Sequence, residues 1–405
     1  LAHDATDFSD GNPAPQNTPY GPYVHDYKNN NGDIIGAYSL LITPPWAGSS
    51  SVTITSTGTL ISNSKTRTVK AVLGIPSFSQ YAALVGAGEL WFRSEETTNG
   101  PVHSNVGVRF DGTNNGIVSA SNLTYIPSVN FGGNGNSSHD GVWGSGGPKS
   151  QWLFPVPPVN FQQVTSDLQT LQTKAAAGGR YLPKSSNLGY FIQFQNDGTY
   201  SLATVTNYTF NTFTHTALIN QPIPLNGIIY SDDDIWVEGT VKGRYTVVAA
   251  TLPSVVSTDR DITITNNIIY TTRDGSDTLG LIGQHDVKAG PMTPDNFEID
   301  AAMLAQTGKV YRPCRWDRPD EKNCFKENGR HSNTYNTRSN ITIYGSVSSF
   351  GSSTWNWSAG NDGTLKSGYE HSDHIYDSHL LYGPPPGFPT TGKYTLLSWR
   401  ELVAP

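Results

Sequence analysis

A basic and aromatic stretch between residues 311 and 338 carries side chains that could bind a polyanion. It holds seven Lys and Arg residues against four Asp and Glu residues, a net +3 in a chain whose formal net charge is −7. Cations at this density neutralise phosphates, and interleaved aromatic rings pack on sugars or bases. The alternative is a solvated loop whose charges pair internally. The predicted DNA contacts are Arg312, Arg315, Trp316, Arg318, Lys322, Lys326, Arg330 and Arg338.

The two cysteines of the chain, Cys314 and Cys324, lie in this same stretch. An even cysteine count in a polar chain with only two Met residues is typical of an oxidising compartment. The residues between them are too polar for a buried pair of reduced thiols, which is the alternative. We therefore predict a disulfide that closes a small loop and presents its basic residues outward.

A second candidate group is acidic. Asp232, Asp233 and Asp234 form one turn, and Asp274 and Asp277 lie in another. Carboxylates on consecutive turns can hold Ca²⁺, or work beside a basic residue in a polysaccharide-cleaving enzyme. Neither an EF-hand loop nor a calcium-binding nonapeptide repeat is present, so solvated turn acids are the favoured interpretation.

A third group consists of His371, His374 and His379 with Asp373 and Asp377, residue types that bind transition metals. Their spacing in a Pro-flanked tail does not place them on a common face, so a structural role is favoured. The chain has no nucleophile elbow, Walker loop, dinucleotide fingerprint or HExxH motif. We expect no catalytic residue, no bound metal and no cofactor.

Short segments with the composition of β-strands are expected to position these three candidate groups. Residues 226–272 contain several runs rich in Ile, Val, Tyr and Thr, separated by Gly, Asn or Asp. Such runs are too short to bury a face alone, but stacked as rungs they share one core. We predict a β-solenoid, with an antiparallel sandwich as the alternative. One helix is predicted at 165–177, with a capping box at Ser166 and Gln169.

The flanking segments predict a separate small sheet. Alternating apolar positions indicate strands at 34–42, 51–61 and 66–75, and an isolated strand at 393–399 is expected to pair with them. The polar, Pro-rich and Asn-rich residues 1–32 are interpreted as a surface leader or linker.

Composition limits the classes of function. Charged residues make up 15% of the chain, and much of its polarity comes from Ser, Thr and Asn, which is typical of a secreted β-protein. The negative net charge excludes a surface uniformly basic for nucleic acid, so such a partner needs a local patch. No apolar stretch reaches the ~20 residues of a membrane span.

Eight phrases along the chain carry a resemblance: SVTITSTG, TRTVKAVL, GPVHSN, NGIIYSDDDIWVEGTVKGRYTVVAA, LGLIGQHDV, IDAAMLAQTG, YDSHLLYGPPPGFP and LSWREL. Together they resemble the soluble part of PilX-like minor pilins of type IV pilus systems, including those that act in natural competence. The resemblance covers most of residues 34–402. It implies a pilin-like antiparallel sheet with a large inserted β-solenoid, and a hydrophobic N-terminal helix that this sequence lacks.

Together these observations predict a mainly β protein with a pilin-like frame at 1–88 and 390–405 and a solenoid at 89–389. By resemblance, we expect a non-enzymatic, extracellular minor pilin at a pilus tip, with double-stranded DNA and other pilin subunits as partners. The membrane would be involved only through the missing helix, as an inner-membrane anchor before assembly. The rivals are an adhesin that binds glycans through exposed Trp and Tyr residues, and a β-helical polysaccharide-active enzyme.

Overall fold

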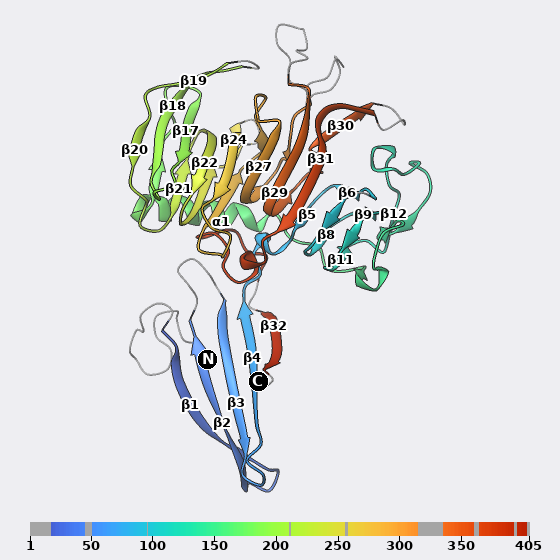
Figure 1. The fold of residues 1–405 in the computed structure, drawn as a ribbon, viewed down its shortest axis with the longest axis vertical. Helices are drawn as coiled ribbons and strands as arrows, with labels where there is room; N and C mark the ends of the chain where they lie inside the picture. The colour runs from blue at the N-terminus through green and yellow to red at the C-terminus, as the bar shows by residue number, and fades with distance from the viewer. Residues whose placement is uncertain are drawn as a thin grey trace. The chain divides into compact units, whose positions relative to one another are not determined.

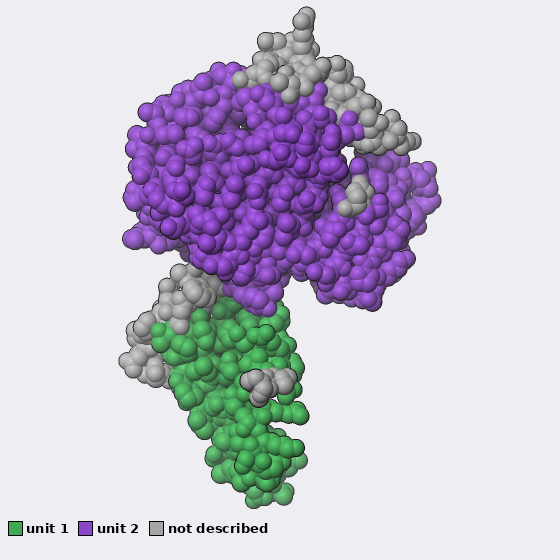
Figure 2. Space-filling view, in the orientation of Figure 1, with its two compact units in different colours: residues 1–76, 390–405 green, residues 77–389 purple. Residues whose placement is uncertain are grey.

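The chain is mainly β, as the sequence predicts, and α1 (Gln163–Gly178) is the single α-helix among the described residues (Figure 1). Two compact units divide it: residues 1–76 with 390–405 form unit 1, and residues 77–389 form unit 2 (Figure 2). Within the described ranges, no helix is both long and apolar enough to cross a bilayer. The computed structural model describes residues 18–44, 51–94, 96–209, 212–255, 258–314, 335–359, 364–392 and 395–402.

Unit 1 contains one antiparallel sheet, in which the last strand of the chain pairs with the early meander as predicted. Trp399 of β32 lies opposite Ala71 of β4. The interpretation of residues 1–32 as a leader is wrong in part, because β1 is a strand that pairs with β2. The pairing contains two register shifts, so β1 has no regular alternation of apolar residues by which the sequence could reveal it. The strand order is β1 (Tyr20–Lys28), β2 (Ile34–Thr43), β3 (Val52–Leu60), β4 (Thr66–Gly74) and β32 (Thr395–Leu402).

The two faces of this sheet differ in chemistry. One face carries an apolar row across four strands, in which Ile42, Ile54, Ala71 and Trp399 are in register. Its members are half-buried or exposed, and Trp399 is 60% exposed. The other face is rich in threonine, with hydroxyl pairs such as Thr57 and Thr68 3.1 Å apart.

Unit 2 is built from parallel ladders of short strands. Rung stacking requires parallel pairing, which an antiparallel sandwich lacks. Unit 2 therefore has the parallel pairing that the predicted β-solenoid needs, and the solenoid itself stays a prediction. The first ladder runs β16 (Arg180–Leu182), β21 (Ile228–Ser231), β23 (Arg244–Ala249), β25 (Thr278–Gly283), β27 (Asn296–Ala305), β29 (Thr337–Ser349), β5 (Ala83–Val85), β8 (Val102–Ser104), β11 (Val118–Ala120) and β15 (Trp152–Leu153).

A second ladder shares the long strands β27 and β29 with the first, so that these strands turn a corner from one ladder to the next. A third ladder shares β24 with the second. The interior between them is filled by Ile, Val, Leu, Tyr and Phe side chains. One ladder runs β17 (Gly189–Phe194), β22 (Asp234–Val241), β24 (Ile262–Tyr270), β27, β29 and β31 (Thr364–Tyr376). The other runs β24, β26 (Val287–Ala289) and β28 (Val310–Tyr311).

The remaining strands are smaller additions. The parallel set comprises β6 (Glu89–Phe92) with β9 (Gly107–Phe110) and β14 (Val142–Trp143), and β7 (Thr97–Thr98) with β10 (Thr113–Asn114). The antiparallel set comprises β18 (Tyr200–Tyr208) on β17, β19 (Phe213–His215) and β20 (Ile219–Gln221) on β18, β30 (Asn356–Ala359) on β31, and β12 (Thr124–Tyr125) with β13 (His139–Asp140). Four 3-10 turns are described: Phe78–Gln80, Val129–Phe131, Lys149–Gln151 and Ser378–Leu381.

The unit boundary lies earlier in the chain than the predicted break after residue 88. Residues 77–88 belong to unit 2 because Phe78 and Leu84 are buried in its core and β5 joins the first ladder. The β-texture of this segment resembles that of the preceding meander, so the sequence does not mark the change.

Helix α1 belongs to unit 2, and its apolar face, which includes Leu168 and Leu171, is buried in the core of that unit. The predicted capping box is wrong. The helix begins after Gln162, earlier than expected, and no side chain caps it, so Ser166 lies inside the helix.

Candidate functional site

The predicted DNA-binding stretch begins at β28 and ends at β29, two strands of unit 2. Its ends are therefore held by two strands of unit 2. Six of the predicted contacts lie outside the described residues, and their role stays a prediction. These are Arg315, Trp316, Arg318, Lys322, Lys326 and Arg330.

Arg312 joins the two ends of this stretch. Its guanidinium donates hydrogen bonds to the backbone carbonyls of Tyr335 (2.6 Å) and Asn336 (3.1 Å), and lies 5.2 Å from the ring centre of Tyr369. The residue is 1% exposed, and burial lowers the pKa of its guanidinium to about 10. Arg312 is therefore a structural clamp in this structure and is not available to a phosphate, contrary to its predicted role.

Arg338, the last predicted contact, is half-buried beside the same end of the stretch. Its guanidinium lies 4.5 Å from the ring centre of Tyr335, and its Nη1 is 3.9 Å from Oδ1 of Asp295. The charge of Arg338 is thus partly used within the protein, and the five basic residues between the clamped ends become the main candidates for phosphate contacts.

Cys314 is fully buried next to Arg312, and no cysteine among the described residues is free. Cys324 lies outside the described residues. The pairing of the two cysteines therefore stays a prediction.

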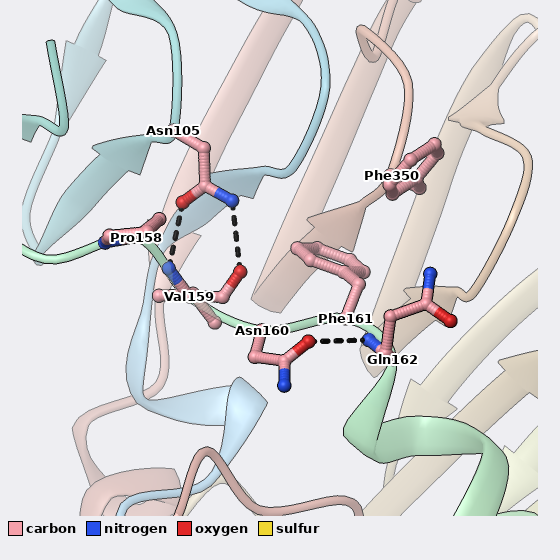
Figure 3. A pocket seen from close by; sticks show the side chains of 7 residues that line it. All are labelled: Asn105, Pro158, Val159, Asn160, Phe161, Gln162 and Phe350. Carbon is pink, nitrogen blue, oxygen red and sulfur yellow. Dashed lines mark hydrogen bonds between the residues drawn. The ribbon is translucent and has the colours of Figure 1, made fainter.

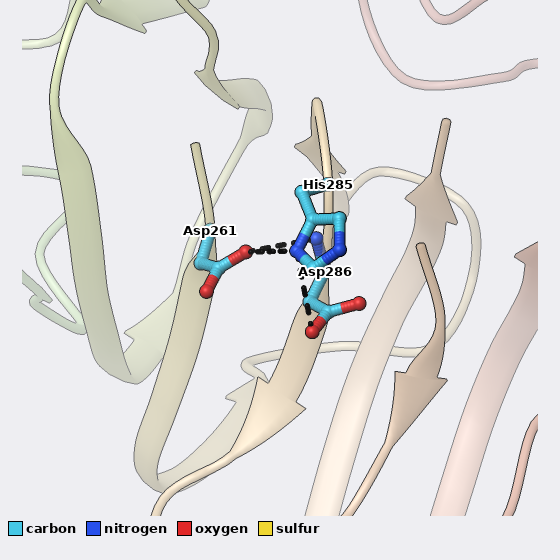
Figure 4. Close-up of side chains that lie close together, drawn as sticks. All are labelled: Asp261, His285 and Asp286. Carbon is cyan, nitrogen blue, oxygen red and sulfur yellow. Dashed lines mark hydrogen bonds and ion pairs between the residues drawn. The ribbon is translucent and has the colours of Figure 1, made fainter. Parts of the chain in front are cut away.

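A second group of titratable side chains, Asp261, His285 and Asp286, lies at the entrances to β24 and β26 (Figure 4). Their ligand atoms all lie within 4.8 Å of one another. Nδ1 of His285 is 3.0 Å from Oδ1 of Asp261 and 3.4 Å from Oδ2 of Asp286. By residue type the group could hold a transition-metal ion.

Hydrogen bonds inside the protein already use these carboxylate oxygens. The ammonium of Lys288 contacts Oδ2 of Asp261, and Oδ1 accepts the Asp286 backbone N–H at 3.0 Å. Asp286 accepts from the Lys309 backbone N–H at 2.7 Å and the Tyr311 hydroxyl at 3.2 Å. The cluster therefore functions as an internally paired network in which Lys288 supplies the cation.

This pairing shifts the pKa values within the cluster. Burial opposes the charged form of Asp261, but hydrogen bonds from His285 and Lys288 outweigh it and lower the pKa of Asp261 to about 2. The hydrogen bond to Asp261 raises the pKa of His285. Burial, together with the charge of Asp261, raises the pKa of Asp286.

The His285 interaction predicts a loss of stability in mildly alkaline solution. Because the folded-state pKa is raised, the contribution is fully present below the unfolded value of about 6.5 and disappears as pH rises through the higher folded value. His285 is 45% exposed, so we expect less than about 1 kcal/mol. The urea midpoint should fall from about pH 6.5 to 8 in the parent but not in His285→Gln. The exposed His371→Gln variant serves as the control, and an unchanged fall in His285→Gln would contradict the assignment.

The carboxylates of this cluster belong to a sequence pattern, but the pattern repeats at unequal intervals and is therefore hard to recognise. Asp234, Asp261 and Asp286 each precede the first Ile or Val of a paired strand: Ile235 lies beside Ile262, and Ile262 beside Val287. The spacings are 27 and 25 residues, so the repeat has no strict period.

The acidic residues of the two predicted turns accept hydrogen bonds from other groups of the protein. Asp233 accepts hydrogen bonds from the backbone N–H and hydroxyl of Ser185 at 3.0 and 2.8 Å. Asp277 accepts from the backbone N–H of Gly243 at 2.6 Å, and Asp274 from Ser276. Among the described residues, neither they nor the histidines of β31 form a metal-ligand group.

The tryptophans of β6 and β14 are relevant to the adhesin alternative, which needs open aromatic faces. The guanidinium of Arg109 lies 4.6 Å from the ring centre of Trp91 and 5.0 Å from that of Trp143. His139 stacks on Trp143 with ring centres 3.9 Å apart. Neighbouring side chains thus occupy these ring faces, and the stack does not offer an open aromatic platform.

No protein-family model matches the sequence, and no curated protein matches it. The crystal structure of the competence-associated pilin ComZ from Thermus thermophilus is similar over 97% of this chain and 89% of that chain, with 12% sequence identity and a TM-score of 0.36. A TM-score of this size does not by itself establish a common fold or function.

Proposed function

We propose that the chain is an extracellular minor-pilin-like subunit of a type IV pilus, and that unit 2 binds double-stranded DNA through the stretch between Cys314 and Tyr335. The DNA would be held by its phosphates without base readout, as an uptake receptor requires. Other pilin subunits are the proposed partners of unit 1.

The hydrogen bonds of Arg312 are the main support for the proposal that unit 2 binds DNA. Because its guanidinium binds the carbonyls of Tyr335 and Asn336, the stretch departs and returns at one place. Five basic residues lie in the sequence between these two ends: Arg315, Arg318, Lys322, Lys326 and Arg330. Local phosphate contacts of this kind do not require a basic molecule overall.

The sheet of unit 1 supports the pilin-like part. Its apolar row from Ile42 to Trp399 has no covering layer among the described residues, and an amphipathic sheet needs a second layer on its apolar face. The resemblance to minor pilins suggests what would cover this apolar face: a hydrophobic helix of the kind that packs pilus subunits together.

Binding of short duplexes tests the DNA proposal. We expect the parent protein to bind two duplexes of unrelated sequence with similar affinity, measured by fluorescence anisotropy near 0.1 M salt. The triple variant Arg315→Ala/Arg318→Ala/Lys322→Ala should bind about a hundredfold more weakly, since it removes three phosphate contacts.

A charge-matched control separates the site from net charge. Lys174, Arg180 and Lys184 are exposed cations on α1, β16 and the segment that follows it. Replacing all three by alanine removes the same charge and should change affinity by less than about threefold. Equal losses of affinity in both triple variants would show that DNA does not bind at the clamped stretch, that is, the residues between Cys314 and Tyr335. Absence of duplex binding by the parent would refute the DNA function.

A further inference from the structure

A pocket of about 310 Å³ lies where the chain enters α1, between Asn105 after β8 and Phe350 after β29 (Figure 3). Its volume is at the lower end of the roughly 300–1,000 Å³ range of small-molecule sites. None of the residues between Cys314 and Tyr335 lines the pocket.

Two aromatic rings form the apolar wall of this pocket. Phe161 and Phe350 meet edge to face with ring centres 5.8 Å apart, and Phe161 meets Phe78 in the same way at 5.0 Å. Gly86 lies directly against both rings, since a Cβ there would be 2.8 Å from Phe161 and 3.0 Å from Phe350. The wall is therefore closely supported, and Phe350 remains half-exposed at its edge.

The lining also contains the side-chain amides of Asn105, Asn160 and Gln162, and it has no charged group. Asn105 is fully engaged, because its Oδ1 accepts from the Val159 backbone N–H at 2.8 Å and its Nδ2 donates to the Val159 carbonyl at 2.9 Å. Asn160 uses only Oδ1, which accepts from the backbone N–H of Gln162 at 2.9 Å. The Nδ2 of Asn160 and the side-chain amide of exposed Gln162 have no partner among the described residues.

This arrangement defines the chemistry of a ligand. Nothing in the lining balances an ionic group, which disfavours phosphates, carboxylates and ammonium groups. An aromatic wall takes up an apolar face by burying it, while a side-chain amide offers adjacent donors and an acceptor. A pyranose ring presents both features, with C–H bonds on one face and neighbouring hydroxyls at its edge.

We propose that this pocket binds one ring of a neutral saccharide, with the C–H face against the half-exposed ring of Phe350 and hydroxyls bonded to Gln162 and Asn160. Phe161, which is 4% exposed, supports Phe350 from behind. A site of this size takes one ring or two, and a ligand of about twelve heavy atoms binds on the order of millimolar. The proposal does not depend on the DNA-binding function, because no basic side chain lines the pocket.

Ligand-observed NMR with the whole chain tests the proposal, using methyl glucoside, methyl galactoside and methyl mannoside as probes and glucuronate as the charged counterpart. We expect at least one neutral glycoside to bind with a Kd on the order of 1 mM, and glucuronate to bind more weakly. Gln162→Ala and Asn160→Ala should each weaken binding about fivefold or more by removing a ligand hydrogen bond.

Gln163→Ala is the matched control, because Gln163 is an exposed amide next in the chain that does not line the pocket. It should bind the glycoside like the parent, as should Arg315→Ala/Arg318→Ala/Lys322→Ala. Absence of saturation by any neutral glycoside at about 20 mM, about twenty times the expected Kd, would overturn the proposal. So would tighter binding of glucuronate, or equal weakening by Gln162→Ala and Gln163→Ala.

Discussion

Replacing Gly345 by alanine is expected to lower the free energy of unfolding of unit 2 by at least about 3 kcal/mol. Gly345 lies in β29 where the strand turns from one ladder to the next, opposite Ala301 of β27 and Tyr376 of β31. Its φ is +146°, and a Cβ would lie 2.0 Å from the carbonyl oxygen of Ala301. Both the backbone angle and the neighbouring backbone oppose a side chain, so the ladder itself must shift.

Urea denaturation followed by tryptophan fluorescence measures this effect. The control is Gly178→Ala at the end of α1, where a Cβ makes only an ordinary 3.7 Å contact with Asn226. That change should be neutral or slightly stabilising, because alanine is the better helix former. A loss below about 1 kcal/mol in Gly345→Ala would mean that the corner can relax and that the ladder geometry is not required there.

Replacing Arg273 by methionine is expected to cost about 2 to 4 kcal/mol near pH 7.5, because it leaves a buried carboxylate without its cation. The side chain of Asp300 is 0% exposed, and Arg273 binds it through Nε at 3.1 Å and Nη2 at 2.8 Å. The same guanidinium pairs with Glu298 and lies 4.5 Å from the ring centre of Tyr344. Methionine keeps much of the apolar stem but removes both hydrogen bonds.

The pH dependence of this variant identifies the cause. Burial already raises the pKa of Asp300, and the Arg273 hydrogen bond opposes that rise, so losing Arg273 raises the pKa further. A native state that binds a proton more tightly gains stability as pH falls, so the deficit should shrink between about pH 7.5 and 4.5. Glu298→Gln, a half-exposed partner, should cost less than about 1 kcal/mol. An equal deficit at both pH values would indicate lost packing instead of an unpaired charge.

Local pattern was enough to predict the β character and the closure of unit 1. The runs within 226–272 become β21 to β24, and the isolated final strand pairs with β4. These features depend on propensity and on the number of apolar positions in a short segment. The strand β1 was missed because its pairing depends on backbone contacts with β2 and not on alternation.

The candidate sites depend on contacts between distant parts of the chain, which local pattern does not specify. Arg312 looked like an exposed cation, but Tyr335 and Tyr369 come from later segments and enclose it. The cluster of Asp261, His285 and Asp286 forms only when coils of unequal length stack. A search for acids before the first Ile or Val of each rung would have found its carboxylates, but not the pairing with Lys288.

The salt dependence of DNA binding tests the central claim most directly. Five phosphates neutralised by the clamped stretch predict that log K for a short duplex falls with log salt at a slope of about −4 to −5. In Arg315→Ala/Arg318→Ala/Lys322→Ala, two contacts remain, and the slope should decrease to about −2. A parent slope near zero, or the same slope in parent and variant, would contradict the assignment of DNA binding to this stretch.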